Sequence, residues 1–201
     1  MRLHPIAWLA LVVALTTPVA ADQSASAITL RSLLPRLEAE TLSGRRIVLP
    51  EDAKGRIGLL VFSFSRGAGD PARCWSETFA RIGMPDADAA SFGILMLGEV
   101  PRIIRGLVVA AIKRGMPAAV HDRTVKMFTD EDAWRARLGV QSADDPHLVL
   151  VDRAGRIRWL YSGACDGVGE QRLREQLSGL LAEKDSPRQA SPHGLPTVSS
   201  L

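Results

Sequence analysis

Gly58-Leu59-Leu60-Val61-Phe62-Ser63-Phe64-Ser65 is predicted to be the central strand of the chain, because a continuous apolar run suits a strand covered on both faces. The loop Arg66-Gly67-Ala68-Gly69 follows, and then the stretch Asp70-Pro71-Ala72-Arg73-Cys74-Trp75-Ser76-Glu77. Asp70 is a good N-cap and Pro71 a good first helical residue, so a helix is expected here. Cys74 then falls in the first helical turn, which makes this region a candidate thiol site.

The other predicted elements follow from hydrophobic periodicity and turn residues. The first helix carries an apolar stripe of Trp75, Phe79 and Ile82, and a later helix begins with a capping box of Thr129 and Asp132. The remaining elements are a hairpin over 42–50 that turns at Ser43-Gly44, strands at 92–97, 145–152 and 156–161, a helix over 101–114, and a last helix with Leu173, Leu177, Leu180 and Leu181 on one side. This order predicts an α/β fold in which helices flank a mixed sheet after an N-terminal hairpin.

The first 21 residues are predicted to be a secretory signal. An apolar core from Ile6 to Leu15 is followed by small residues that offer a cleavage point before Asp22. This core is shorter than the ~20 residues needed to span a bilayer, so cleavage is favoured over a retained anchor. We expect an exported protein, periplasmic if bacterial, with one domain over 22–182 and a disordered tail over 183–201 that is rich in Pro and Ser.

The charge balance excludes one class of partner. Lys and Arg together number 25 against 22 for Asp and Glu, with no run of basic residues and a single Tyr. A nucleic-acid platform of basic and aromatic residues is therefore not expected. Nothing in the sequence indicates a bound cofactor, and we expect the partner to be another protein.

Three motifs resemble the thioredoxin-like superfamily, in particular its TlpA and AhpC/TSA branches. They are the hairpin Leu-x-Gly-x-x-Val-x-Leu over Leu42 to Leu49, the helix motif Cys74-Trp75-Ser76-Glu77, and the signature formed by Pro146, Leu150, Asp152, Gly155 and Ile157. The resemblance implies a thioredoxin-like sheet in which Pro146 is cis and faces the thiol site. It also implies a binding surface formed by Pro71, Trp75, Glu77, Pro146 and His147.

A narrower resemblance is to the mitochondrial ATP synthase assembly-factor family, a thioredoxin-like group without a redox dithiol. It rests on the stretch Met127 to Gly139, on the strand Arg156-Ile157-Arg158-Trp159 before Ser162-Gly163, and on a basic, apolar helix after the second core strand. The signal segment departs from an Arg-rich mitochondrial presequence, which leaves the partner open. This resemblance implies a role in assembly rather than turnover.

Pro71 decides against standard dithiol chemistry. In the thioredoxin-like family the attacking cysteine stands three residues before the second one, and here that position is proline. Cys74 takes the place of the second, shielded cysteine. The candidate catalytic thiol is therefore Cys74, either as a helix-start thiolate or as a structural cysteine, and the residues alone favour neither.

Two other chemistries are disfavoured. A peroxidase of this superfamily needs a Thr or Ser between its proline and its cysteine, and none lies between Pro71 and Cys74. Copper delivery would need a second cysteine beside Cys74. His121 and His147 remain, but a lone His is more often an ordinary residue than a ligand, so no metal site is expected.

Cys165 is the candidate partner thiol of Cys74. In a thioredoxin-like sheet the strand that starts at Pro146 begins near the site loop, and the next strand returns to the same end. Cys165 follows that strand and can approach Cys74 across about ninety residues of sequence. A structural bridge, a redox pair and two free thiols all remain open, because the sequence does not give the separation of the Cα atoms.

The helix over 101–114 has two interpretations. Its basic residues flank an apolar stripe, which would suit docking to an anionic membrane or a partner helix. The alternative, which we favour, is a helix that covers the sheet with solvated ends. The basic residues are Arg102, Arg105, Lys113 and Arg114.

The sequence as a whole predicts an exported thioredoxin-like protein that lacks the C-x-x-C dithiol. We expect it to act as a binding or assembly factor for envelope or membrane proteins. The alternative is an enzyme, a thiol-disulfide oxidoreductase or peroxidase that uses Cys74 with or without Cys165.

Overall fold

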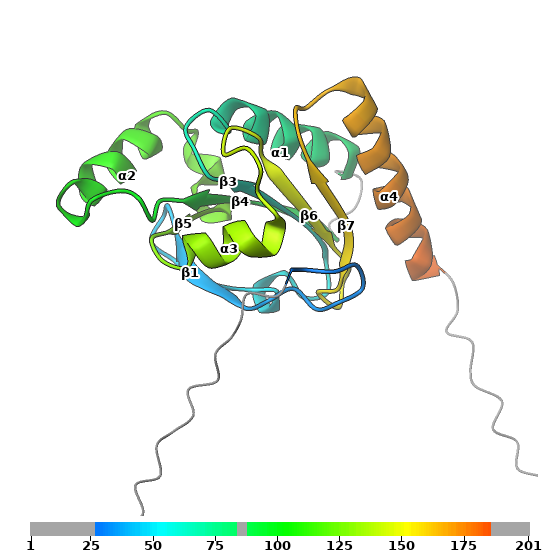
Figure 1. Cartoon of the computed structure of the whole chain (residues 1–201). Coiled ribbons are helices and arrows are strands. Elements are labelled where there is room, and N and C mark those ends of the chain that lie inside the picture. Colours follow the sequence, from blue (N-terminus) through cyan, green and yellow to red (C-terminus); the bar gives the residue numbers. More distant parts are fainter. Residues whose placement is uncertain (1–26, 84–87, 186–201) are drawn as a thin grey trace, which may run out of the picture.

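A seven-stranded mixed sheet organises the described part of the chain. The computed structural model describes residues 27–83 and 88–185, so the predicted signal and most of the predicted tail lie outside it. Strands run in the order β2-β1-β5-β4-β3-β6-β7, with β3, β4 and β5 parallel and the other neighbours antiparallel (Figure 1). The strands are β1 Leu37–Thr41, β2 Arg46–Leu49, β3 Ile57–Ser63, β4 Ala89–Met96, β5 Thr124–Met127, β6 His147–Val151 and β7 Ile157–Ser162. The predicted fold class is confirmed.

Four α-helices and three 3-10 helices lie between or after the described strands. They are α1 Gly69–Gly83, α2 Arg105–Arg114, α3 Glu131–Leu138, α4 Gly167–Asp185, η1 Glu51–Ala53, η2 Arg102–Ile104 and η3 Ala118–Arg123. In the described residues no helix is long and apolar enough to cross a bilayer. The last helix continues three residues beyond the expected domain end at 182, and Glu183 in it pairs with Arg158.

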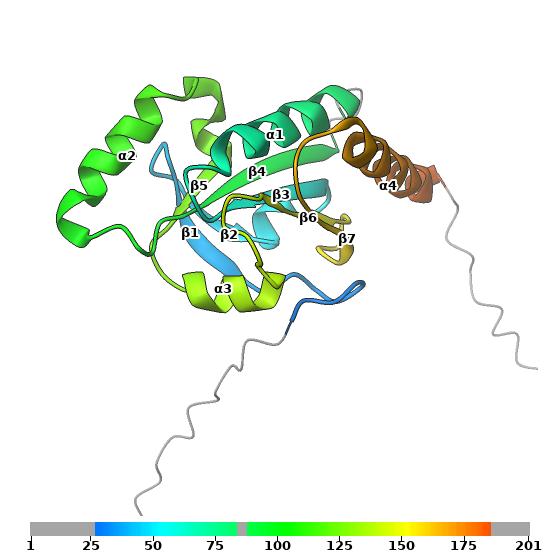
Figure 2. The ribbon, with the colours of Figure 1, turned by 45° about the horizontal axis from the view of Figure 1, so that its top comes forward.

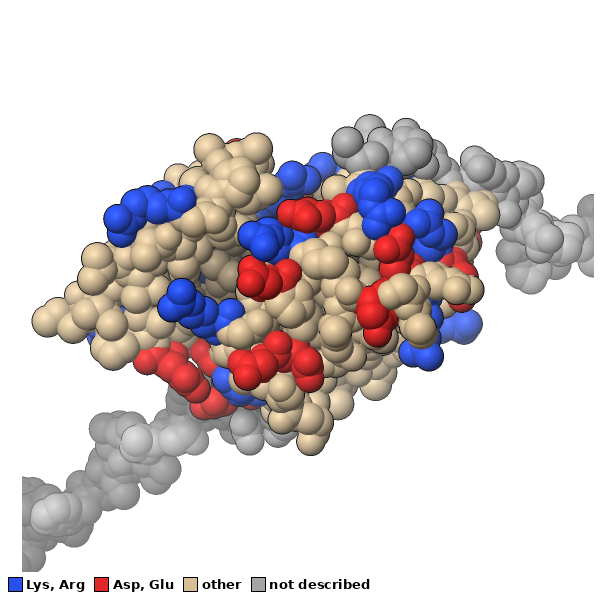
Figure 3. Space-filling view, turned by 90° about the horizontal axis from the view of Figure 1, so that it is seen from above, with Lys and Arg blue, Asp and Glu red and all other residues tan. Residues whose placement is uncertain are grey.

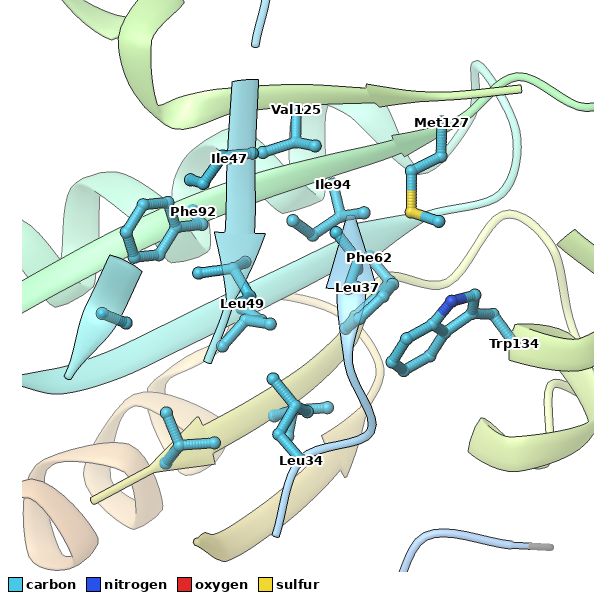
Figure 4. Close-up of a cluster of buried hydrophobic side chains, with 14 of the residues drawn as sticks. Leu34, Leu37, Ile47, Leu49, Phe62, Phe92, Ile94, Val125, Met127 and Trp134 are labelled. Carbon is cyan, nitrogen blue, oxygen red and sulfur yellow. The ribbon is translucent and has the colours of Figure 1, made fainter. Parts of the chain in front are cut away.

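Strand β3 lies at the centre and is buried along its whole length, as its continuous apolar run predicts. Its side chains alternate between two layers. Leu60 and Phe62 join the layer shown in Figure 4, where Phe62 lies 5.0 Å from the ring of Trp134 on α3. Leu59 and Val61 face the layer formed by α1 and α4 (Figure 2).

The α1–α4 layer confirms both predicted apolar stripes. Trp75 and Phe79 of α1 are buried, and Ile82 packs at the edge of the same cluster. Leu173, Leu177 and Leu180 of α4 are also buried there, with Leu181 partly covered. Because these residues recur at helical spacing, each helix buries one side against the sheet.

Strand β5 was not predicted. It is only four residues long and follows η3 directly, so it offers no extended alternation of polar and apolar residues. Its position is important, because it pairs with β4 on one side and β1 on the other. In the sheet, β5 is the strand that joins the N-terminal hairpin to the parallel strands, through its pairing with β1. That hairpin does turn at Ser43-Gly44, but its first strand precedes the predicted range.

The predicted capping box of α3 is wrong. Thr129 bonds to the neighbouring Asp130 side chain, and Asp130 has a left-handed backbone with φ 61°. The helix begins at Glu131 instead, whose buried carboxylate accepts a hydrogen bond from the Gly98 amide at 2.8 Å. This contact ties the start of α3 to the loop after β4, and the N-cap residue Asp130 makes no side-chain cap hydrogen bond.

The favoured interpretation of the helix over 101–114 is also wrong. Neither η2 nor α2 contains a buried residue, and α2 lies beyond the edge of the sheet in both ribbon views (Figures 1 and 2). The short η3 helix packs against β1, β4 and β5. Since η3 occupies the position next to these strands, α2 is left without sheet to cover.

Candidate functional site: a disulfide at the sheet edge

The candidate thiol site lies where β3 ends and α1 begins. Strand β3 ends at Ser63 and α1 begins at Gly69, one residue before the predicted start. The amide of Ala72 already bonds to the carbonyl of Ala68 at 2.9 Å. Cys74 therefore lies in the second turn, beyond the free amides of the helix start that lower a thiol pKa. The structure thus does not support the helix-start interpretation of Cys74.

Cys74 and Cys165 are joined in a disulfide. Their Cα atoms are 6.1 Å apart and the residues are 91 positions apart in sequence. Cys165 lies in the connection between β7 and α4. The predicted return of the chain is confirmed, because His147 at the start of β6 pairs with both Phe62 of β3 and Ser162 of β7. The pairing of the two cysteines, left open by the sequence, is thereby decided in favour of a bridge.

Further contacts hold the same connection to α1. The indole N–H of Trp75 donates to the carbonyl of Gly163 at 3.1 Å, and the Tyr161 ring meets the Trp75 ring edge to face at 5.4 Å. Gly169 packs so closely on Trp75 that a Cβ there would come within 2.6 Å of the indole. The disulfide is thus one part of a larger contact between α1 and the residues 161–169.

An ion pair and a cap extend this contact into α4. Arg81 of α1 lies 3.1 Å from Glu170 of α4, and this pair lowers the pKa of Glu170. Asp166, next to Cys165, accepts a hydrogen bond from the amide of Gly169 at 2.7 Å and so caps α4. The bridge therefore joins α1 to the fixed start of another helix.

Pro146 is not cis, which corrects the isomer implied by the family signature. Among the described residues the cis peptide is Leu49–Pro50. A trans bond is the lower-energy isomer for most X–Pro pairs, and the Pro-to-Asp spacing of the signature does not determine the isomer. Pro146 is buried, and its carbonyl accepts a bond from the Gly163 amide at 3.3 Å.

The segment before Pro146 does reach the site loop. The Ser65 hydroxyl donates to Asp144 at 2.5 Å, and a Cβ on Gly67 would overlap the same carboxylate. Asp144 thus ties the β6 side of the site to the loop before α1. The sequence analysis missed Asp144, since no motif separates it from the neighbouring Asp145.

His147 is buried and has a structural role. Its Nδ1 donates to the carbonyl of Asp145 at 3.0 Å, so its Nε2 accepts from the Ser162 hydroxyl at 3.3 Å. Burial lowers the pKa of His147, and the ring is held neutral. Its ring also meets Phe64 edge to face at 5.7 Å.

The other predicted binding residues do not form one surface. Trp75 is fully buried, Pro71 is half-exposed in the first turn, and Glu77 points to solvent beside Arg73 at 4.0 Å. In the described residues, no group of three or more His, Cys, Asp and Glu side chains is placed to hold a metal ion. The structure therefore brings Cys74, Trp75 and Cys165 together but leaves Glu77 apart from them.

Comparison with known proteins identifies the architecture. No family model matches the sequence, and no curated protein matches it significantly. A putative protein disulfide isomerase from Bacteroides thetaiotaomicron matches with a TM-score of 0.55 and 17% identity, over 79% of this chain and 93% of its own. A putative thiol:disulfide interchange protein DsbE from Chlorobium tepidum matches with a TM-score of 0.56 and 14% identity, over 77% and 99%. This chain has a thioredoxin-like fold.

BsSco, a member of the Sco family of cytochrome c oxidase assembly proteins, is similar to a comparable degree. Its TM-score is 0.56 at 12% identity, over 78% of this chain and 97% of its own. At these identities the likeness concerns the thioredoxin-like fold alone. The chemistry must therefore be argued from Pro71 and from the Cys74–Cys165 bond of this chain.

Proposed function

We propose that this chain is an exported thioredoxin-like binding protein that assists the assembly of envelope or membrane proteins without dithiol turnover. The observation that carries the proposal is the Cys74–Cys165 bond. It uses both cysteines of the sequence to join two elements of the fold. No thiol stands in the first turn of α1, where Pro71 takes the place of the attacking cysteine.

Dithiol exchange requires an attacking thiolate that a substrate disulfide can reach, with a second thiol to resolve the mixed disulfide. Pro71 supplies neither a thiol nor an amide proton at the helix start. Cys74 is turned toward the β7–α4 connection and is already bonded there. The pair is therefore better suited to fixing α4 on α1 than to cycling.

Three points support the proposal. An oxidising compartment favours a persistent disulfide, which agrees with the apolar segment at residues 6–15 acting as an export signal. BsSco, which has a fold of this kind, belongs to a family of cytochrome c oxidase assembly proteins. The resemblance to the ATP synthase assembly-factor family points to the same class of role.

The test is insulin reduction with dithiothreitol. We expect the rate with the wild-type protein to equal that with the double variant Cys74→Ser and Cys165→Ser. A wild-type rate well above that control would overturn the non-enzymatic proposal.

A gain-of-function variant tests the role of Pro71 directly. The double change Pro71→Cys and Cys165→Ser places a C-x-x-C pair at the start of α1 and frees Cys74 from its partner. We expect this variant to reduce insulin above the background, with Cys165→Ser alone as its control. If it stays at background, Pro71 is not the reason for the missing activity.

A redox pair is the second candidate, favoured by one observation. Cys74 and Cys165 are both partly exposed rather than sealed in the core. A substrate thiolate could attack one sulfur, release the other as a thiolate and form a mixed disulfide. A second substrate thiolate would then release the oxidised substrate and leave both cysteines reduced. Turnover of a dithiol substrate that requires both cysteines would select this candidate.

A further inference from the structure

The connection between β4 and β5 carries a surface that the proposed function does not use. We call residues 101–121 the α2 arm; it contains η2, α2 and the start of η3. Its sequence holds four Lys or Arg residues, one histidine (His121) and no Asp or Glu. The basic residues are Arg102, Arg105, Lys113 and Arg114.

An apolar stripe runs along the outer side of the α2 arm. Ile103 is 93% exposed, Leu107 68% and Ile104 41%, although these are among the most apolar side chains of the chain. Ala110 and Ala111 continue the stripe, because both are exposed and follow Leu107 at helical spacing. Large exposed apolar side chains gathered on one element mark an interaction surface.

Arg105, the first residue of α2, attaches the arm to the rest of the fold. The Arg105 side chain donates to the carbonyl of Val100 at 3.0 Å, and its guanidinium lies 4.5 Å from the centre of the Phe128 ring. At the other end, the amide of Gly115 closes the helix on Ala111 and Ile112. The Arg105 contacts hold the start of α2, and the apolar stripe is left uncovered.

The remaining cations are free to meet a ligand. In the described part of the chain, Arg102, Lys113 and Arg114 have no acidic partner; Arg114 bonds to the carbonyl of Ala110, and Glu99, just before the arm, pairs with Arg135. Figure 3 shows the α2 arm on the left as mainly uncharged surface, with basic residues at its margin. Arg102 lies before the stripe, and Lys113 and Arg114 lie at its end.

We propose that the α2 arm lies on the surface of an anionic membrane, with Ile103 and Leu107 at the boundary between headgroups and acyl chains. A ten-residue helix is about 15 Å long, which suits a position in the plane of the interface and is too short to span a bilayer. Basic side chains at both ends can reach anionic headgroups while their stems stay in the interface. This inference goes beyond the proposed function, since it concerns a surface away from the disulfide.

Charge favours lipid over a second copy of the chain. Two α2 arms that met along their stripes would bring cations of the same sign together without an acidic residue from either arm. An anionic bilayer supplies the apolar layer and the negative charge in one partner. Self-association and binding to a protein are outcomes that the test can detect.

The experiment is vesicle flotation with the chain that begins at Asp22, which retains every described residue. Vesicles are phosphatidylcholine alone or phosphatidylcholine with 30% phosphatidylglycerol, a composition we choose for the assay. We expect binding to the anionic vesicles only. Each basic residue near such a surface contributes about fivefold to binding, so Arg102→Gln, Lys113→Gln and Arg114→Gln together should lose on the order of 100-fold.

Matched controls separate the arm from general charge and apolarity. The triple change Lys54→Gln, Arg66→Gln and Arg172→Gln removes the same charge from exposed positions elsewhere and should lose much less than the arm triple. Ile103→Ser with Leu107→Ser should weaken binding by at least about tenfold. Leu30→Ser, at a residue 60% exposed outside the arm, should not.

Several outcomes would overturn the proposal. They are equal binding to both vesicle types, equal losses in the two charge triples, and the absence of binding to anionic vesicles. Self-association measured by light scattering and abolished by Ile103→Ser with Leu107→Ser would assign the stripe to a second copy. Circular dichroism of each variant checks that the fold is retained.

Discussion

Helices α1 and α2 make the same kind of connection between strands, but α1 buries large side chains and α2 buries none. Each follows a strand of the parallel set and leads to the next one, from β3 to β4 and from β4 to β5. Helix α1 buries Trp75 and Phe79 and is bonded to the β7–α4 connection through Cys74. Helix α2 buries none of its residues. Apolar content alone therefore does not decide whether a helix becomes part of the core.

The arrangement of apolar residues explains the difference. In α1 the large side chains recur on one side, and charged residues occupy the other. In α2 the side with Val108, Val109 and Ile112 is only half-buried, and the side with Leu107, Ala110 and Ala111 is exposed. Since η3 already contacts the nearby strands, α2 would gain little by folding back. The comparison assigns α1 to stability and α2 to surface interactions.

The disulfide should have the largest effect on stability. Replacing Cys74→Ser and Cys165→Ser should lower the free energy of unfolding by roughly 4 kcal/mol, because the bridge closes a long loop in the unfolded chain. Urea denaturation with and without reductant measures this. The wild-type protein should become less stable on reduction, while the double variant should not respond. If the oxidised and the reduced wild-type protein unfold at the same urea concentration, the disulfide does not stabilise the α1–α4 layer.

The same substitution in two helices tests the burial difference. Leu173→Ala in α4, where the side chain is fully buried against α1, should cost about 2–5 kcal/mol. Leu107→Ala in α2 should change the free energy of unfolding by less than about 0.5 kcal/mol, because the residue is exposed. Similar losses at the two positions would show that α2 packs on the body in solution.

Glu131 connects the base of the α2 arm to α3, and its removal should have an intermediate effect. Glu131→Ala leaves the Gly98 amide and Arg135 without their buried acceptor, which should cost about 1–3 kcal/mol. Asp132→Ala, at an exposed position in the same turn, is the matched control. If the control loses as much stability, the Gly98 contact is not what holds the arm.

The smallest effect concerns pH. Burial lowers the pKa of His147, so the folded state stays neutral where the unfolded chain, with an ordinary pKa near 6.5, takes up a proton. Above about pH 6.5 His147 is neutral in both the folded and the unfolded state, so its protonation does not affect the free energy of unfolding. Below that pH the unfolded chain takes up the proton first, and the free energy of unfolding falls. His147→Gln should show a flatter stability profile between pH 7 and pH 5. If the free energy of unfolding of the variant depends on pH as strongly as that of the wild type, another residue causes the pH dependence.

The sequence predicted the parts of the fold that local patterns determine. The apolar run of β3, the stripe of α1 and the leucines of α4 were all placed correctly, because periodicity reports burial directly. Strand β5 was too short to show a pattern. The position of α2 depends on which space η3 leaves open, and no local signal carries that information.

The site was predicted less completely than the fold. The sequence placed Cys165 near Cys74 through the order of strands, but the bond depends on a separation that only the folded chain gives. The isomer of Pro146 was wrong, because residue spacing does not determine it. Asp144 and Gly169 were missed, since their roles arise from contacts with residues far along the chain.

The bond between α1 and the β7–α4 connection is the central claim, and thiol counting tests it most directly. The chain is purified without reductant, denatured, alkylated and digested, and its peptides are examined by mass spectrometry. We predict no alkylated cysteine and one peptide pair that joins Cys74 to Cys165. Two alkylated cysteines would contradict the account.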